Sequence, residues 1–271
     1  MINYKELITV AVRAAFNAGK EILGVYNSKD FGIKIKADKS PLTWADKNAH
    51  EIIDDFLQST NIPILSEEGK EIPFNERSKW EYYWLIDPLD GTKEFINRNG
   101  EFTVNIALIH HGIPVAGVVY APCLNDLYFA VKEVGAFKLS VFNLNLEELS
   151  LDSLIKKSQK LPIFSKKEKF TVVGSRSHMN EDTNKFIDTL KKQYGNIEFI
   201  SKGSSLKIVM VAEGRADSYP RFAPTMEWDT AAGHAVALYA GCEITEKDEK
   251  TPLIYNKKEL LNPWFIVKHK C

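Results

Sequence analysis

The densest group of residues able to do chemistry lies at positions 84–93 (WLIDPLDGTK), where an apolar strand leads into a turn. The strand delivers two carboxylates, Asp87 and Asp90, into a segment rich in turn-forming residues. A helix is expected to start at Gly91-Thr92, and the backbone N–H groups at such a start bind anions. Carboxylates beside an anion site indicate a bridging divalent cation, for which their oxygens suit Mg²⁺. The alternative is an Asx-type turn in which both aspartates only accept backbone hydrogen bonds.

Further acids stand at the ends of other expected elements. Glu67 and Glu68 follow a short apolar strand, and Asp229 stands at the entry to a helix of small residues. Asp46 comes three residues after Thr43, which is the spacing of a capping box. Each acid has a simpler interpretation: surface acids at 67 and 68, a plain N-cap at 229 and a capping acid at 46. The four positions together favour a site more than any one does.

Four segments in this order resemble the motifs of the inositol monophosphatase superfamily: 38–46 (DKSPLTWAD), 67–68 (EE), 87–92 (DPLDGT) and 227–233 (EWDTAAG). Members of that superfamily are Mg²⁺-dependent, lithium-sensitive phosphomonoesterases. The resemblance implies a layered αβαβα sugar-phosphatase fold, of α+β or α/β class. It also implies two subdomains with the active site between them.

The resemblance assigns a role to each acid. It implies two or three Mg²⁺ ions whose ligands are the carbonyl of Leu89 and the side chains of Glu67, Asp87, Asp90 and Asp229. It further implies that Thr92, with Glu67, activates the attacking water, and that Asp46 helps to hold a third ion. Gly91 and Thr92 would donate to the phosphate. Two metal ions suit this reaction, because phosphate-monoester hydrolysis is among the slowest reactions in water.

The second half of the chain carries basic and hydroxyl groups near helix and strand ends. They occur in the segments 174–178 (GSRSH) and 203–207 (GSSLK) and before Asp229 at Arg221. Arginine suits bidentate recognition of phosphate and stacks on planar bases. We expect a pocket for a second phosphate, with Asp229 at its border and lined by Ser175, Arg176, His178, Ser204, Lys207 and Arg221. The alternative is surface turns with unrelated basic residues.

These two segments resemble the 3′(2′),5′-bisphosphate nucleotidases of the CysQ type. That resemblance implies hydrolysis of the 3′-phosphate of adenosine 3′,5′-bisphosphate to AMP and phosphate, with the corresponding phosphosulfate as a second candidate substrate. An inositol or sugar monophosphatase of the same fold is the nearest alternative, and fructose 1,6-bisphosphatase is a weaker one. A non-catalytic regulatory protein on the same scaffold is a third, although a scaffold has no need of so many acids.

Composition sets the outer limits. The chain has 271 residues with 35 Lys+Arg against 36 Asp+Glu, so the formal net charge of −1 argues against a general binder of nucleic acid polymers. The three cysteines show no metal-binding or redox spacing. We find neither a signal peptide nor an apolar run long enough to span a bilayer, which predicts a cytoplasmic protein. Peripheral association with the inner membrane is left open, as is the choice between monomer and homodimer.

Hydrophobic periodicity predicts the elements that must position these residues. Helices are expected at 4–26, 44–57, 182–194, 204–213 and 229–240, and strands at 62–66, 80–86, 103–110, 114–120, 126–131 and 170–174. The close spacing of the strands between 103 and 131 indicates an antiparallel meander. Lysine-rich residues 140–170 are expected to be a solvated connector. We therefore divide the chain into an α+β metal-binding subdomain (1–140) and an α/β substrate-recognition subdomain (141–271).

One further pair of residues is conspicuous. His110 and His111 precede Gly112 at the expected end of a strand. We expect these histidines to form a turn rather than a metal site.

Overall fold

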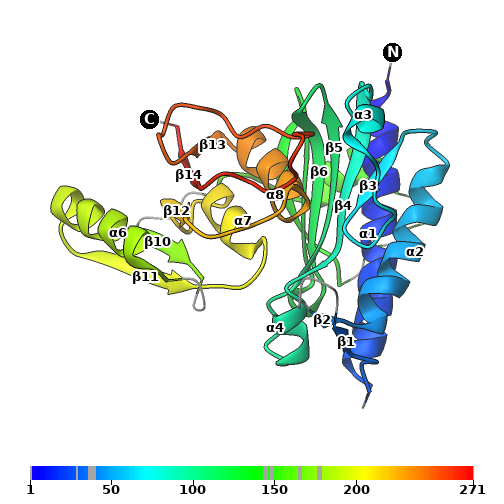
Figure 1. Cartoon of the computed structure of the whole chain (residues 1–271), viewed down its shortest axis with the longest axis horizontal. Coiled ribbons are helices and arrows are strands. Elements are labelled where there is room, and N and C mark those ends of the chain that lie inside the picture. Colours follow the sequence, from blue (N-terminus) through cyan, green and yellow to red (C-terminus); the bar gives the residue numbers. More distant parts are fainter. Residues whose placement is uncertain are drawn as a thin grey trace.

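The computed structural model describes residues 2–28, 30–35, 41–142, 144, 146, 149–163, 167–175 and 179–270. Its helices are α1 (Tyr4–Tyr26), α2 (Trp44–Gln58), α3 (Phe74–Arg77), α4 (Thr92–Ile96), α5 (Leu151–Lys157), α6 (Glu181–Tyr194), α7 (Leu206–Ala212) and α8 (Glu227–Tyr239), with a 3₁₀ turn at Pro122–Leu124. Figure 1 shows five layers: α1 and α2, a sheet, α7 and α8, a second sheet, and α6. The αβαβα arrangement expected from the sequence is confirmed.

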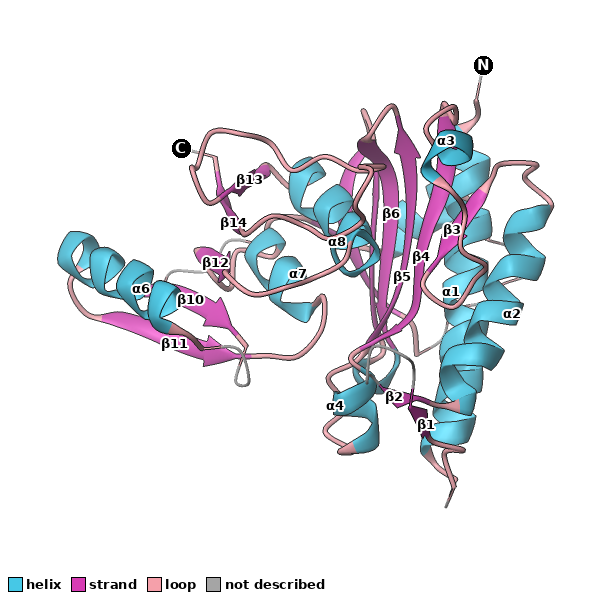
Figure 2. Cartoon of the chain, viewed as in Figure 1, coloured by secondary structure: helices cyan, strands magenta, loops and turns pink. Residues whose placement is uncertain are grey.

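The first sheet has seven strands in chain order (Figure 2). They are β3 (Ile64–Ser66), β4 (Tyr82–Asp90), β5 (Thr103–His110), β6 (Ile113–Ala121), β7 (Asp126–Val131), β8 (Gly135–Ser140) and β9 (Gln159–Lys160). The β3–β4 pair is parallel and all the others are antiparallel, so the predicted meander is confirmed. The predicted end of β4 at residue 86 is wrong. The strand continues to Asp90 because its pairing with β5 resumes after a register shift between Asp87 and Asp90.

The second sheet is mixed. Its strands are β10 (Phe170–Gly174), β11 (Ile197–Ser201), β12 (Ser218–Arg221), β13 (Cys242–Glu246) and β14 (Phe265–His269), in the order β11-β10-β12-β14-β13. β10 is parallel to β11 and β12, whereas β14 is antiparallel to β12 and β13. A two-stranded ribbon of β1 (Lys34–Ile35) and β2 (Pro41–Leu42) lies near α4.

The helices that frame the site begin and end where their sequence dictates. α2 starts at the predicted capping box, in which Thr43 Oγ1 accepts the Ala45 N–H and Asp46 accepts the Thr43 N–H. α8 ends before Gly241, whose φ of 89° closes the helix in the left-handed region. Within the described residues, no helix is both long and apolar enough to cross a bilayer.

The segment expected to be a solvated connector contains ordered structure instead. Ser150 caps α5, and this helix buries Leu151 and Leu154 in the apolar cluster that also contains residues of α1 and the first sheet. Strand β9 pairs with β8. The prediction gave most weight to the lysines of this segment and overlooked the apolar residues Leu151 and Leu154, whose spacing places them on one face of the helix. The division of the chain at residue 140 stays a prediction.

Apolar side chains fill the space between each pair of layers. One cluster lies between α1, α2 and the first sheet, and a second lies between the two sheets around α7 and α8. A third, smaller cluster joins α6 to the second sheet. The contact of α8 with β6 is especially close, because a Cβ at Gly117 would lie 2.7 Å from Ala235 Cβ and 2.8 Å from the Ala232 carbonyl oxygen.

We therefore predict that Gly117→Ala destabilises the protein by ~1–3 kcal/mol through overpacking between β6 and α8. Gly24→Ala is the matched control, because a Cβ at this exposed position in α1 would meet nothing within 4 Å. Since alanine is the better helix former, the control should gain ~0.5–1 kcal/mol. Chemical denaturation measures both values, and equal stabilities for the two variants would contradict the close packing.

Candidate active site

Three carboxylates from three elements meet at one point. Glu67 directly follows β3, Asp87 lies in β4 and Asp229 lies in the first turn of α8. One oxygen from each of these side chains lies within 4.8 Å of the others. Asp87 is buried, and the other two are half-buried. The parallel β3–β4 pairing brings Glu67 beside Asp87, because the carboxyl ends of both strands reach the same edge of the sheet.

The charges of this group oppose one another. Burial raises the pKa of Asp87 well above its ordinary value, and the charges of Glu67, Asp90 and Asp229 raise it further. Burial likewise raises the pKa of Asp229, again helped by Asp90 and Glu67. Like charges that face each other in a poorly solvated place disfavour ionisation. A cation between these oxygens would reverse that effect.

The donor set fits a divalent cation. The converging atoms are carboxylate oxygens, which are the ligands that hard ions such as Mg²⁺ prefer. The carbonyl of Leu89 lies between the two aspartates of β4 and is close to Thr92, whose hydroxyl is 3.4 Å from it. The group therefore has the chemistry expected of a metal site.

The simpler interpretation of Asp87 describes part of the geometry, whereas that of Asp229 is wrong. Asp87 Oδ1 accepts the Leu89 N–H at 3.0 Å, as in an Asx-type turn. Asp229 is not the N-cap of α8: the helix begins two residues earlier, and Asp229 Oδ2 accepts the N–H of Met226 at 2.9 Å. These bonds orient each carboxylate through a single oxygen.

Asp46 joins the first turn of α2 to the start of α4. Its Oδ2 accepts from the backbone N–H and hydroxyl of Thr43, and its Oδ1 accepts from the Thr92 hydroxyl at 3.2 Å. Asp46 is therefore a capping acid, as its spacing predicts, and also a partner of a predicted catalytic residue. Thr92 follows Gly91, whose φ of 93° sets the turn that begins α4.

Asp90 lies beside the three carboxylates and is held by residues that sequence reasoning missed. Ser205 Oγ lies 3.1 Å from Asp90 Oδ2 and 2.8 Å from the Asp229 carbonyl, and it accepts a hydrogen bond from Asn105. Burial raises the pKa of Asp90, whereas the Lys207 charge and the Ser205 hydroxyl lower it. A polar residue in the middle of the apolar strand β5 was the one signal that Asn105 gave in the sequence.

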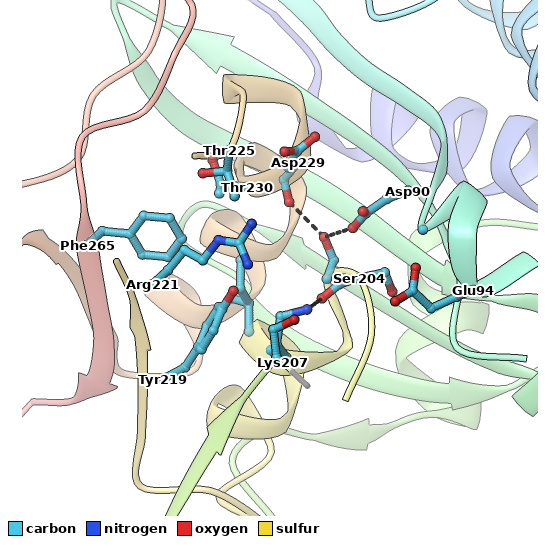
Figure 3. A pocket seen from close by; sticks show the side chains of 14 residues that line it. Asp90, Glu94, Ser204, Lys207, Tyr219, Arg221, Thr225, Asp229, Thr230 and Phe265 are labelled. Atoms are coloured by element: carbon cyan, nitrogen blue, oxygen red, sulfur yellow. Dashed lines mark hydrogen bonds between the residues drawn. The ribbon is translucent and has the colours of Figure 1, made fainter. Parts of the chain in front are cut away.

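A pocket opens next to Asp90 and Asp229, and Figure 3 shows side chains of both sheets and of α7 and α8 around it. Of the residues predicted to bind substrate, it is lined by Gly91, Ser175, Ser204, Lys207, Arg221 and Asp229. Tyr219 and Phe265 also line it, together with Glu94, which the sequence did not indicate. Arg176 and His178 lie outside the described residues.

Two basic side chains, Lys207 and Arg221, line this pocket and face the acids Asp90, Glu94 and Asp229. Burial lowers the pKa of Lys207 to about 8, Asp90 opposes that change, and Arg221 adds to it. The Lys207 ammonium donates to the Ser204 carbonyl at 2.6 Å, and Arg221 donates to the Pro224 carbonyl at 2.8 Å. The Nε of Arg221 is buried and has no hydrogen-bond partner in the described part of the chain.

The segment before α7 connects this pocket to the acids. Ser204 adopts a left-handed backbone with φ of 42°, and its buried hydroxyl has no partner among the described residues. Glu101 holds the segment in place by accepting the Gly203 N–H and the Lys202 ammonium. Strain in a non-glycine residue and an unpaired buried hydroxyl are features of ligand sites.

We predict that Mg²⁺ raises the stability of the wild-type chain, by about 2.7 kcal/mol at 100 times its Kd. Asp87→Asn should lose more than half of this gain. Without metal at neutral pH, the variant should be at least as stable as the wild type. A raised carboxyl pKa means that the folded state binds the proton more tightly than the unfolded state, so stability falls as pH rises above the ordinary carboxyl range.

Thermal unfolding with and without Mg²⁺ measures these differences. Glu68→Gln is the matched control, since it removes a neighbouring acid outside the group of three. The cation assignment would be wrong if Asp87→Asn gained as much stability from Mg²⁺ as the wild type.

Comparisons with known proteins identify the family of the chain. The model of the Inositol monophosphatase family matches residues 3–267. The chain is 47% identical over 260 residues to the 3′(2′),5′-bisphosphate nucleotidase CysQ of Shigella flexneri, covering 93% of this chain and 96% of that protein. The CysQ of Escherichia coli strain K12 is 46% identical with the same coverage.

Solved structures extend the likeness to three dimensions. The crystal structure of CysQ from Bacteroides thetaiotaomicron has a TM-score of 0.92 and 51% sequence identity, covering 98% of both chains. The inositol monophosphatase TM1415 of Thermotoga maritima shares the fold, with a TM-score of 0.72 at 23% identity over 97% of this chain and 92% of that one. The family match spans every element that contributes to the site, and the chain belongs to the inositol monophosphatase family.

Proposed function

We propose that the chain is a 3′(2′),5′-bisphosphate nucleotidase that hydrolyses the 3′-phosphate of adenosine 3′,5′-bisphosphate to AMP and phosphate. The observation that carries this proposal is the contact between two oppositely charged groups: the carboxylates around Asp87 adjoin a pocket that contains Lys207 and Arg221. One phosphate would lie at the acids and the second in the basic pocket. The CysQ relatives, which carry this activity in their names, support the same substrate. The corresponding phosphosulfate is a second candidate.

Two or three Mg²⁺ ions complete the proposed site. The ligands would be the Leu89 carbonyl and the side chains of Glu67, Asp87, Asp90 and Asp229, with Asp46 assisting a third ion. When bound, such ions would neutralise phosphate charge and acidify a water molecule. The raised pKa values of Asp87 and Asp229 support this role, because a bound cation favours the ionised form of both.

Thr92 and Glu67 would prepare the attacking water. The acceptors next to the Thr92 hydroxyl are Asp46 Oδ1 at 3.2 Å and the Leu89 carbonyl at 3.4 Å, so its hydrogen is directed into the protein. Its lone pairs are then available to accept a hydrogen from water, which would fix the direction of attack. The Glu67 carboxylate would accept the proton that the water loses. The backbone N–H groups of Gly91 and Thr92 would hold the phosphate.

The second phosphate would be recognised from the other half of the chain. Arg221 and Lys207 supply positive charge, and the unpaired Ser204 hydroxyl supplies a donor. Ser175 would contribute from the end of β10, and we assign Arg176 and His178 to the same phosphate from their place in the sequence. Charge-assisted hydrogen bonds of this kind are the strong ones in phosphate recognition.

This assignment describes an enzyme for a small nucleotide rather than for a nucleic acid polymer. The near-zero net charge supports that choice, because polymer binding draws on a broad basic surface. We propose that the enzyme works in the cytoplasm as a monomer or homodimer.

A substrate panel tests the function. With Mg²⁺, we expect release of phosphate from adenosine 3′,5′-bisphosphate at a kcat/KM at least tenfold above that for inositol 1-phosphate or fructose 1,6-bisphosphate. Lithium should inhibit the reaction, and chelation of Mg²⁺ should stop it. Preference for inositol 1-phosphate would favour the monophosphatase, and no hydrolysis of any substrate would favour a non-catalytic protein.

The basic pocket makes a separate prediction. Lys207→Met should raise KM for adenosine 3′,5′-bisphosphate about tenfold or more, corresponding to about 1.4 kcal/mol of lost binding, and change KM for a simple monophosphate much less. Lys132→Met, at an exposed turn, is the matched control and should behave as the wild type. Equal losses on both substrates would show that Lys207 does not bind a second phosphate.

A further inference from the structure

A turn is confirmed next to His110, at His111-Gly112, and it assembles a group of possible ligands where the sequence led us to expect no metal site. His110 ends β5, and His111 and Gly112 form the two-residue connection to Ile113 of β6. Glu81, the residue before β4, lies beside this turn. Its backbone carbonyl accepts the His111 N–H at 3.1 Å. The hairpin thereby holds two imidazoles against the Glu81 side chain.

The three side chains converge. A ring nitrogen of each histidine and one Glu81 carboxylate oxygen all lie within 4.8 Å of one another. His110 Nε2 is 3.4 Å from Glu81 Oε1, and the two imidazole centroids are 4.3 Å apart. The side chain of His110 is 27% exposed and that of Glu81 is 64% exposed, so an ion could reach the group from solvent.

The backbone of the turn adopts a left-handed conformation that is unfavourable for a histidine. His111 and Gly112 have φ values of 48° and 75°, which is the left-handed pair of a type I′ hairpin turn. Asparagine is the usual first residue of such a turn, and a histidine there is uncommon. A residue held in this region by its surroundings points to a function at that position.

Neighbouring groups fix one ligand in place. The His110 ring stacks on Tyr82, with centroids 4.1 Å apart and planes 11° apart. The turn itself is anchored because Gly112 accepts the Tyr255 N–H at 3.0 Å, and a Cβ at Gly112 would lie 3.0 Å from the Tyr255 carbonyl oxygen. Stacking restrains the His110 rotamer, and the contacts with Tyr255 anchor the turn. Both lower the conformational entropy that the side chains lose when a metal binds.

From this geometry we infer that Glu81, His110 and His111 form a second metal site, which takes a transition-metal dication of the zinc class. Two imidazoles and one carboxylate, with a fourth position open to water, are a ligand set that Zn²⁺ uses. Mg²⁺ avoids nitrogen ligands, so the two sites differ in the ion that each selects. Glu81, the residue before β4, lies six residues or roughly 20 Å along the strand from Asp87.

Zinc binding to the full chain tests the inference. The protein is freed of metal, given excess Mg²⁺ to occupy the carboxylates, and titrated with Zn²⁺ against a chromophoric zinc chelator. We expect the wild type to bind one more Zn²⁺ per chain than His111→Asn or Glu81→Gln. His111→Asn is the more informative variant, because Asn-Gly suits the turn and keeps the fold. Glu133→Gln, another exposed acid in a turn, is the matched control and should keep the extra Zn²⁺.

Two further measurements separate this site from the acids around Asp87. Asp87→Asn should retain the extra zinc, and Mg²⁺-dependent hydrolysis should be the same in His111→Asn as in the wild type. Zn²⁺ should raise the unfolding midpoint of the wild type more than that of His111→Asn. The inference is overturned if His111→Asn binds as much zinc as the wild type, or if Glu133→Gln loses as much as Glu81→Gln.

Discussion

The repulsion between the carboxylates of Glu67, Asp87 and Asp229 is the constraint on which the rest of the structure depends. Each acid is positioned by a different element, and the charges of Glu67 and Asp229 help to raise the pKa of Asp87, as the charge of Glu67 helps to raise that of Asp229. Left to themselves, such groups would separate into water. They stay together because the β3–β4 pairing and the burial of α8 between two sheets fix the backbones that carry them. The free energy gained by packing the layers thus offsets the electrostatic repulsion between these carboxylates.

The same arrangement also brings the acids into contact with the basic side chains of the neighbouring pocket. Asp90 lowers the cost of burying Lys207, and Lys207 in turn favours the ionised form of Asp90. Ser204 and Ser205 lie between the two groups, one with an unpaired hydroxyl and the other bonded to Asp90. A net charge of −1 therefore conceals adjacent regions of opposite sign. Substitutions in this segment should affect the acids and the basic pocket together, because the same backbone positions both.

The sequence was a good guide wherever the pattern was long and local. The apolar stripe of α1, the capping box of α2 and the period of β5 and β7 predicted those elements closely. The sequence analysis did not predict strands β11 to β14, because they are short. Pro220 in β12 and the exposed residues of β11 further weaken the strand pattern. The acids were recognisable by type and order. The hydrogen bonds that Ser205 accepts from Asn105 and donates to Asp90 depend on tertiary packing, which local periodicity does not encode.

The place of α8 between the two sheets has a consequence for motion. Its residues Ala231 and Val236 belong to the cluster that also contains Val119 of the first sheet and Val267 of the second. Because both sheets cover this helix, its backbone amides should exchange with solvent only when one of the sheets unfolds, an opening whose free energy approaches that of global unfolding. The amides of α6, which rests on the smallest cluster, should exchange through local openings of much lower free energy. The element that carries Asp229 would then be among the slowest in the chain to exchange, and the candidate active site would include one of the most protected helices.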